Sequence, residues 1–219
     1  MRDGVPSASR RKLFEINGLN ATVSYFGLAE INDSVTFEQF LDVFTKDHGA
    51  SDLEAFANSL TLELCNRVDK DALKKCPSGL HVCGFTASAT PEFWFVRNVR
   101  GIDDKNYVGF DEVYTATEEL RGHHQALNFD ESKQDFINQF GMNFANGDLR
   151  PFHYAWRLFD LFAENMVSEG VAAQPTSHED AQKRLEWKMQ AIAGFYSSAA
   201  IEPSIGGPIT TVVLSPIVI

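Results

Sequence analysis

The sequence predicts a mixed fold of the α+β class, with layered β-sheets covered by helices, in a single domain over residues 1–219. Strand-like segments flank a pair of helix-like segments and return near the end of the chain, an order that favours layered sheets over an alternating parallel sheet. Hydrophobic residues make up 44% of the chain, which is enough for one sizeable core. The chain has 18 phenylalanines, and rings of this size are typical of a core between packed layers.

The first pair of strands is predicted at residues 13–16 and 21–26. Both segments are rich in β-branched and aromatic residues, which favour strands. Asn17, Gly18 and Asn20 lie between them and are typical turn residues. This composition predicts a β-hairpin.

Two consecutive helices are predicted next, at about 36–46 and 52–68. Each begins with a capping box, a Ser or Thr that is followed three residues later by Glu or Gln. The two boxes are Thr36 with Gln39 and Ser51 with Glu54. Behind each box the apolar residues recur at intervals of three and four, the period of a helix with one buried face.

A second hairpin is predicted at 80–86 and 93–97, with small residues and Pro91 between its strands. The four residues from Phe93 to Val96 are all apolar. An uninterrupted apolar run is typical of a strand that is covered on both faces. The sheet is therefore expected to lie between two layers.

The second half of the chain has a weaker pattern. Residues 100–150 are predicted to be an irregular, insertion-like region with short helical stretches at 110–120 and 133–140. Regular spacing then returns. The elements predicted beyond this region are a helix over 155–166, a helix capped by Ser177 and Asp180, and a last strand at 208–214.

Charge and cysteine content narrow the possible functions. The formal net charge of −11 repels nucleic-acid phosphates and anionic membranes, so neither is expected as a partner. The three cysteines have no C-x-x-C spacing and predict neither a disulfide framework nor a zinc cluster. No apolar run reaches the length of about 20 residues that spans a bilayer, and none resembling a signal peptide follows Met1. We expect a cytoplasmic protein without a cofactor or a metal.

Two clusters that contain histidine are weaker candidates for chemistry. His123 and His124 adjoin Gly122, which interrupts a helix, and no H-E-x-x-H spacing exists, so a solvated loop is expected there. His81 and Cys83 alternate on one predicted strand. No acidic residue with the spacing of a catalytic triad follows them, so core packing is predicted for both.

Three segments occur in a recognisable order. In KLFEINGLNATVSYFGLAE, at 12–30, a lysine precedes a strand and a small-residue turn leads towards the first helix. SGLHVCGFTASATPEFWFVRN, at 78–98, forms the hairpin after the helix pair, and EPSIGGPITTVVLSP, at 202–216, has an acidic residue before a Gly-Gly pair and a strand. Together with the helix pair, these segments resemble the proteasome β-type subunits of the N-terminal-nucleophile (Ntn) hydrolase superfamily. Residues 100–150 depart from that pattern.

The resemblance implies a four-layer αββα sandwich, two stacked sheets between helix layers, with the N-terminal strand or strands missing. It also implies threonine-type peptidase or amidase chemistry, in which a Thr, Ser or Cys at a freed N-terminus is the nucleophile. Lys12 matches the family's active-site lysine, and Glu202 matches the aspartate before the Gly-Gly pair. Ile205 stands where the family has a serine. Lys12 and Glu202 are therefore the candidate catalytic residues, and Asp3 is a weaker match to a further aspartate.

The nucleophile has no match in the segment before Lys12. The chain begins with Met1, and Ser7 and Ser9 lie too close to the lysine to serve from the expected first strand. The chain is therefore expected to be inactive as written. A longer form would carry the nucleophile and cut a peptide or amide substrate, or the protein is a non-catalytic structural subunit of a homo-oligomeric assembly.

An alternative from another class is an unrelated α/β binding module built on one open sheet. Without the resemblance, Lys12 is typical of a lysine that limits pairing at the edge of a sheet. Glu202 would then be an acidic residue at a helix end.

Overall fold

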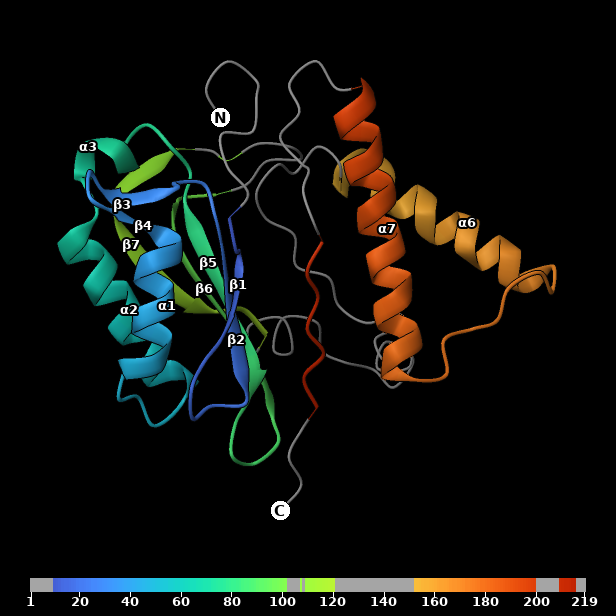
Figure 1. Ribbon diagram of the computed structural model, residues 1–219, viewed down its shortest axis with the longest axis horizontal. Helices are drawn as coiled ribbons and strands as arrows, with labels where there is room; N and C mark the ends of the chain where they lie inside the picture. The colour runs from blue at the N-terminus through green and yellow to red at the C-terminus, as the bar shows by residue number, and fades with distance from the viewer. Residues whose placement is uncertain (1–9, 102–106, 108, 121–151, 200–208, 216–219) are drawn as a thin grey trace. The chain divides into compact units, whose positions relative to one another are not determined.

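The computed structural model describes residues 10–101, 107, 109–120, 152–199 and 209–215 (Figure 1). The chain divides into two compact units. Of the described residues, 11–101, 107, 109–120 and 214–215 form one unit, which we call the sheet unit, and residue 10, 152–199 and 209–213 form the other, the helical unit. The single domain over 1–219 stays a prediction.

A five-stranded antiparallel sheet is the framework of the sheet unit. Its strand order is β1-β2-β5-β6-β7, and each neighbouring pair is antiparallel. The strands are β1 (Leu13–Glu15), β2 (Ala21–Phe26), β5 (Gly79–Phe85), β6 (Pro91–Val99) and β7 (Phe110–Glu118). The α+β class and both predicted hairpins, β1–β2 and β5–β6, are confirmed.

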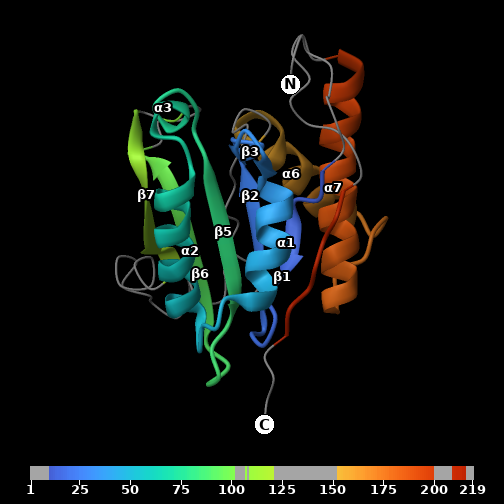
Figure 2. The ribbon, with the colours of Figure 1, turned by 60° about the vertical axis from the view of Figure 1, so that its left-hand side comes forward.

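Helices cover one face of this sheet. They are α1 (Phe37–Asp47), α2 (Leu53–Arg67) and the short α3 (Lys70–Leu73), and a two-stranded sheet of β3 (Glu30–Asn32) and β4 (Val35–Thr36) precedes α1. Figures 1 and 2 show α1 and α2 side by side against the sheet. The main core lies between these helices and the sheet. It includes Phe14, Val23, Phe37, Leu41, Phe56, Leu60, Leu64, Leu80, Val82 and Val96. The predicted helix pair is therefore confirmed.

The two helices of this pair begin with different caps. At α1 the predicted capping box is present, since the Gln39 amide donates to Thr36 Oγ1 at 3.1 Å and the Thr36 amide donates to Gln39 Oε1 at 3.0 Å. At α2 the prediction was wrong by one residue, because Asp52 is the N-cap and its Oδ1 accepts from the Ala55 amide at 2.8 Å. The Ser51 hydroxyl instead donates to Asp52. A carboxylate caps as well as a hydroxyl and is also favoured by the helix dipole.

Strand β7 replaces the short helical stretch predicted at 110–120. Tyr114 and Ala116 pack against the main core, whereas Thr115 and Thr117 between and beyond them are exposed. This alternation has the period of a strand. Pairing with β6 provides hydrogen-bond partners for the backbone groups along one edge of β7.

The strand predicted at 208–214 was also wrong within the described residues, since 209–215 carry no strand. The hydrogen bonds of this segment come from side chains instead. Gln182 Nε2 donates to Thr211 Oγ1 at 2.7 Å, and Asn20 Nδ2 donates to the Ser215 carbonyl at 2.7 Å.

The helical unit contains a π-helical turn, η1 (Phe152–Trp156), followed by α6 (Arg157–Ser168) and α7 (His178–Ala199). Both predicted helices are confirmed. The predicted cap is present too, because the Asp180 amide donates to Ser177 Oγ at 3.1 Å. No described helix is long and apolar enough to cross a membrane. The helix predicted at 133–140 lies outside the described residues.

Aromatic and charged contacts join α6 to α7. The Trp187 ring lies 5.4 Å from that of Phe159 and 6.1 Å from that of Phe162, centroid to centroid. Lys188 is only 6% exposed, pairs with Asp160, and places its Nζ 4.1 Å from the ring centroid of Trp156. The buried ammonium is thus held by a carboxylate and an aromatic ring.

Asn98 on β6 is the centre of a buried polar network. Its Oδ1 accepts from the Ser78 amide at 2.8 Å, and its Nδ2 donates to the carbonyls of Leu73 at 2.8 Å and Cys76 at 3.1 Å. Next to it, the Ser78 and Tyr114 hydroxyls are hydrogen-bonded at 2.8 Å. Burial raises the pKa of Tyr114 well above its usual value. The network fixes the segment after α3 to the sheet.

Gly27 ends β2 in a tight turn that only glycine fits. Its φ is +83°, and a Cβ atom built there would lie 1.9 Å from the Pro77 carbonyl oxygen. Gly18, in the β1–β2 turn, has a similar φ of +76°, but a Cβ atom there would meet nothing within 4 Å. The two glycines therefore share a backbone conformation and differ in surroundings.

Candidate functional site

Lys12 lies immediately before β1 and opposite Tyr25 of β2, whose amide donates to the Lys12 carbonyl at 3.3 Å. The Lys12 side chain is exposed, and its Nζ lies 3.7 Å from the centroid of the Tyr25 ring. The Tyr25 ring is buried and stacks on Phe37, the first residue of α1, at a centroid distance of 5.2 Å. One aromatic ring therefore contacts both the ammonium and the beginning of a helix.

This arrangement gathers positive potential at one end of the sheet. A cation over an aromatic face is attracted by the ring quadrupole, which holds the ammonium in place. The first turn of α1 adds the positive end of the helix dipole, while its Phe37 and Gln39 amides donate to the Ala29 carbonyl and to Thr36 Oγ1. A group that develops negative charge would be stabilised beside Lys12 and Tyr25.

The second predicted catalytic residue, Glu202, lies outside the described residues, as does Asp3. The pairing of Lys12 with Glu202 in one cleft stays a prediction. Tyr25 was not among the site residues predicted from the sequence. The register of the β1–β2 hairpin identifies it. Leu13 pairs with Ser24, so counting outward from the turn places Tyr25 opposite Lys12.

The face of the sheet that α1 and α2 do not cover carries a second apolar cluster, which we call the aromatic face. Its core is Phe93, Phe95 and Val99, with Phe26, Cys83, Tyr107, Phe110 and Leu120 packed around it. These side chains alternate along β6 with Trp94 and Val96, which point into the main core. The strand covered on both faces that the apolar run predicted is therefore confirmed.

His81 lies within the aromatic face. Its ring centroid is 4.8 Å from that of Phe93 and 5.0 Å from that of Phe95. Part of the residue remains accessible, but the Nε2 atom is buried and has no hydrogen-bond partner in the described part of the chain. Burial, with a smaller contribution from Arg97, lowers the pKa of His81 to about 4, so the imidazole is neutral at pH 7.

Cys83, two residues along β5, is not an activated nucleophile. Burial raises its pKa to about 12, and only the thiolate form of a cysteine attacks. A neutral histidine packed between rings and an un-ionised thiol do not form a catalytic pair. The core packing predicted for His81 and Cys83 agrees with these contacts.

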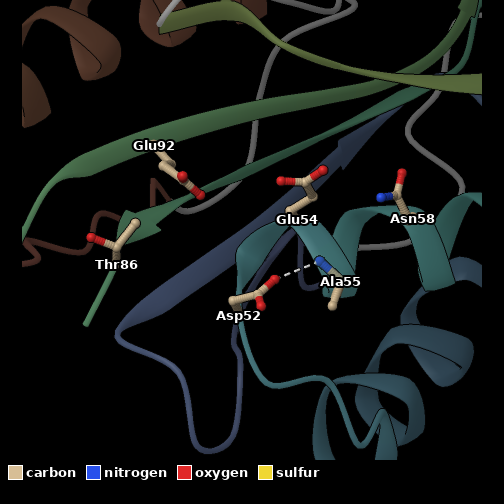
Figure 3. Close-up of a pocket in the computed structure, with 6 residues that line it drawn as sticks. All are labelled: Asp52, Glu54, Ala55, Asn58, Thr86 and Glu92. Atoms are coloured by element: carbon tan, nitrogen blue, oxygen red, sulfur yellow. Dashed lines mark hydrogen bonds between the residues drawn. The ribbon is translucent and has the colours of Figure 1, made fainter. Parts of the chain in front are cut away.

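An open pocket of about 420 Å³ lies where the turn of the β5–β6 hairpin meets the beginning of α2. Figure 3 shows Asp52 at the N-cap of α2, and Glu54 and Asn58 on its first turns, beside Thr86 and Glu92 of the hairpin. Two of the three carboxylates already have structural roles. Asp52 caps α2, which lowers its pKa through the Ala55 amide and the Ser51 hydroxyl, and Glu92 accepts from the Trp94 indole at 3.3 Å.

Asp52 and Glu92 are therefore held by contacts within the sheet unit. Among the residues that the structure describes, no three His, Cys, Asp or Glu side chains are grouped so that they would hold a metal ion. His123 and His124 lie outside that part of the chain.

Comparisons of the chain with protein-family models, with curated proteins and with solved structures found no match. Lys12 with Tyr25, whose ring stacks on the first residue of α1, is the candidate functional site.

Proposed function

We propose that this protein has the four-layer αββα fold of the Ntn hydrolases, is related to the proteasome β-type subunits, and acts on peptide or amide bonds with Lys12 as the charged group of its site. The observation that carries the proposal is the contact of Lys12 with Tyr25. It holds the Lys12 ammonium over a ring that stacks on the first residue of α1, and the charge of this lysine would stabilise a developing oxyanion.

In this proposal Lys12 has two tasks. Its positive charge lowers the pKa of a nearby nucleophile, because an opposite charge favours the ionised form. It also stabilises the negative charge that develops on the carbonyl oxygen when an amide bond is attacked. Glu202 would orient the lysine, as the resemblance implies.

The aromatic face supports the layered part of the proposal. Phe93 and Phe95 lie on the face of the sheet opposite α1 and α2, and only 7% and 4% of these residues are exposed. A strand that is buried on both faces is what an inner layer of a four-layer sandwich requires.

A cytoplasmic location and assembly with further copies of the chain belong to the same proposal. All three cysteines, Cys65, Cys76 and Cys83, are free thiols, which suits a reducing compartment. Assembly is implied by the resemblance alone.

The test is hydrolysis of a set of fluorogenic peptide amides by the longest natural form of the chain. Lys12→Ala is expected to lower kcat/KM about 10²–10³-fold, the usual effect of removing one charge-stabilising group. Lys12→Arg should retain part of the activity because the charge remains. Lys75→Ala, which changes another exposed lysine of the sheet unit, is the matched control and should have no effect. Equal turnover by the parent and Lys12→Ala would remove Lys12 from the site.

A second candidate is an α/β binding module. The observation that favours it is that the described strands form one five-stranded sheet, with only the small β3–β4 pair beside it. If the unsubstituted protein hydrolyses no peptide amide and sediments as a monomer, the result supports a binding module. A parent that is inactive but oligomeric would support a structural subunit.

A further inference from the structure

His81 is held by its neighbours in a packing that disfavours the protonated imidazole. The ring is packed against Phe93 and Phe95, and its buried Nε2 has no described partner that would accept a hydrogen bond from a protonated imidazole. A buried charge without a partner costs several kcal/mol, so the closed packing selects the neutral ring. Protonation is therefore favoured when water reaches the aromatic face.

The charged neighbours of His81 add to this effect. On β6, the Arg97 guanidinium lies 4.4 Å from the Phe95 ring centroid and forms an ion pair with Glu119 at 3.0 Å. On β5 the neighbour on the same face is the un-ionised Cys83 thiol, and on β2 the residue opposite is Ser24, which carries no charge. Among the described residues, the charged group that acts on His81 is thus the Arg97 guanidinium. The carboxylate of Glu119 already forms an ion pair with this guanidinium.

We propose that His81 makes the aromatic face acid-sensitive, because protonation of its imidazole favours a state in which this face opens to water. The device is local to β5 and β6, since Val82 and Val96 on the opposite side of the same strands stay packed under α1 and α2. Acid would therefore loosen one layer of the sheet unit and leave the other in place.

The pH range follows from the sign of the linkage. The pKa is about 4 in the closed state and returns towards 6.5 when the ring is hydrated. The closed state is therefore favoured fully above pH 6.5, and its advantage falls as the pH drops from 6.5 to 4. Between pH 7 and pH 5 the ratio of open to closed molecules should rise about 20-fold.

Cys83 provides a reporter of this opening. The residue is partly buried on the same face, two residues from His81, so a thiol reagent should reach it faster when the face opens. Labelling of the full chain with 4,4′-dithiodipyridine at pH 7 and pH 5, located on Cys83 by peptide mass spectrometry, measures the open fraction. His81→Leu is the matched variant, because leucine fills the aromatic site and does not titrate. Since the same thiol is labelled at the same pH, differences in thiolate content cancel between the two proteins.

The expected result is that the labelling rate of the parent, divided by that of His81→Leu, rises about 20-fold from pH 7 to pH 5. A ratio that does not change with pH overturns the proposal. A second measurement needs no variant: the imidazole resonance of His81 in the parent, followed by NMR from pH 8 to 4. Titration near 6.5 with Cys83 still protected would also overturn it.

Discussion

Asn98 offers the sharpest test of how the sheet unit is held together. The side chain is 1% exposed and makes three hydrogen bonds to backbone groups, those of Ser78, Leu73 and Cys76. Asn98→Ala removes all three and leaves one amide and two carbonyls without a partner in a buried place. Asn98→Asp keeps the acceptor for the Ser78 amide but turns a carboxylate oxygen towards the two carbonyls.

The expected loss follows from these bonds. Each buried hydrogen bond contributes about 1 kcal/mol, and a backbone group left unpaired costs more, so Asn98→Ala should lower the free energy of unfolding by about 3–5 kcal/mol. Asn98→Asp should lower it at least as much at pH 7, because a buried charge is added. At acidic pH the aspartate would be protonated and regain a donor, so part of its loss should be recovered.

Urea denaturation followed by circular dichroism measures the effect. For a slope of about 2 kcal/mol per molar, the midpoint of Asn98→Ala should fall by roughly 2 M. Asn66→Ala is the matched control, since Asn66 is exposed near the end of α2 and its loss should stay within about 0.5 kcal/mol. The reasoning is refuted if Asn98→Ala and Asn66→Ala unfold at similar urea concentrations.

Two further predictions rest on local contacts. Gly27→Ala should cost at least about 3 kcal/mol and Gly18→Ala only about 1, because both strain a left-handed backbone but only Gly27 meets the Pro77 carbonyl. Thermal melting of the two variants measures the difference, and equal melting temperatures would contradict the contact. In the helical unit, Asp160→Ala should destabilise by about 3 kcal/mol and Lys188→Met by less, because the first leaves a buried ammonium without its carboxylate whereas the second leaves a carboxylate that water can reach. Urea denaturation of both variants checks the order, and the reverse order would refute it.

Local patterns were sufficient to predict much of the sheet unit. The Thr36 box, the helical spacing behind it and the turn residues around Gly18 act within a few residues, so they can be recognised in the sequence. Asp52 was passed over because Ser51 has the same capping chemistry one position earlier. When two neighbouring residues have similar propensities for the N-cap position, the surrounding fold determines where the helix begins.

The errors and omissions depend on partners distant in sequence. β7 contains the charged residues Asp111, Glu112 and Glu118, which make the alternation of Tyr114 with exposed threonines hard to recognise in the sequence. The segment is a strand because it pairs with β6. The Asn98 network likewise needs three chain segments to meet. For the candidate site, Lys12 was predicted from the resemblance, whereas Tyr25 required the register of a hairpin.

The three tryptophans divide between the two units in a way that gives each its own optical signal. Trp94 is 7% exposed in the main core of the sheet unit, whereas Trp156 of η1 and Trp187 of α7 belong to the contacts that join η1 and α6 to α7. Emission from a variant that retains only Trp94 would report loss of the sheet core, and emission from one that lacks it would report separation of the helices. Whether the units melt together or in sequence can therefore be observed within one chain.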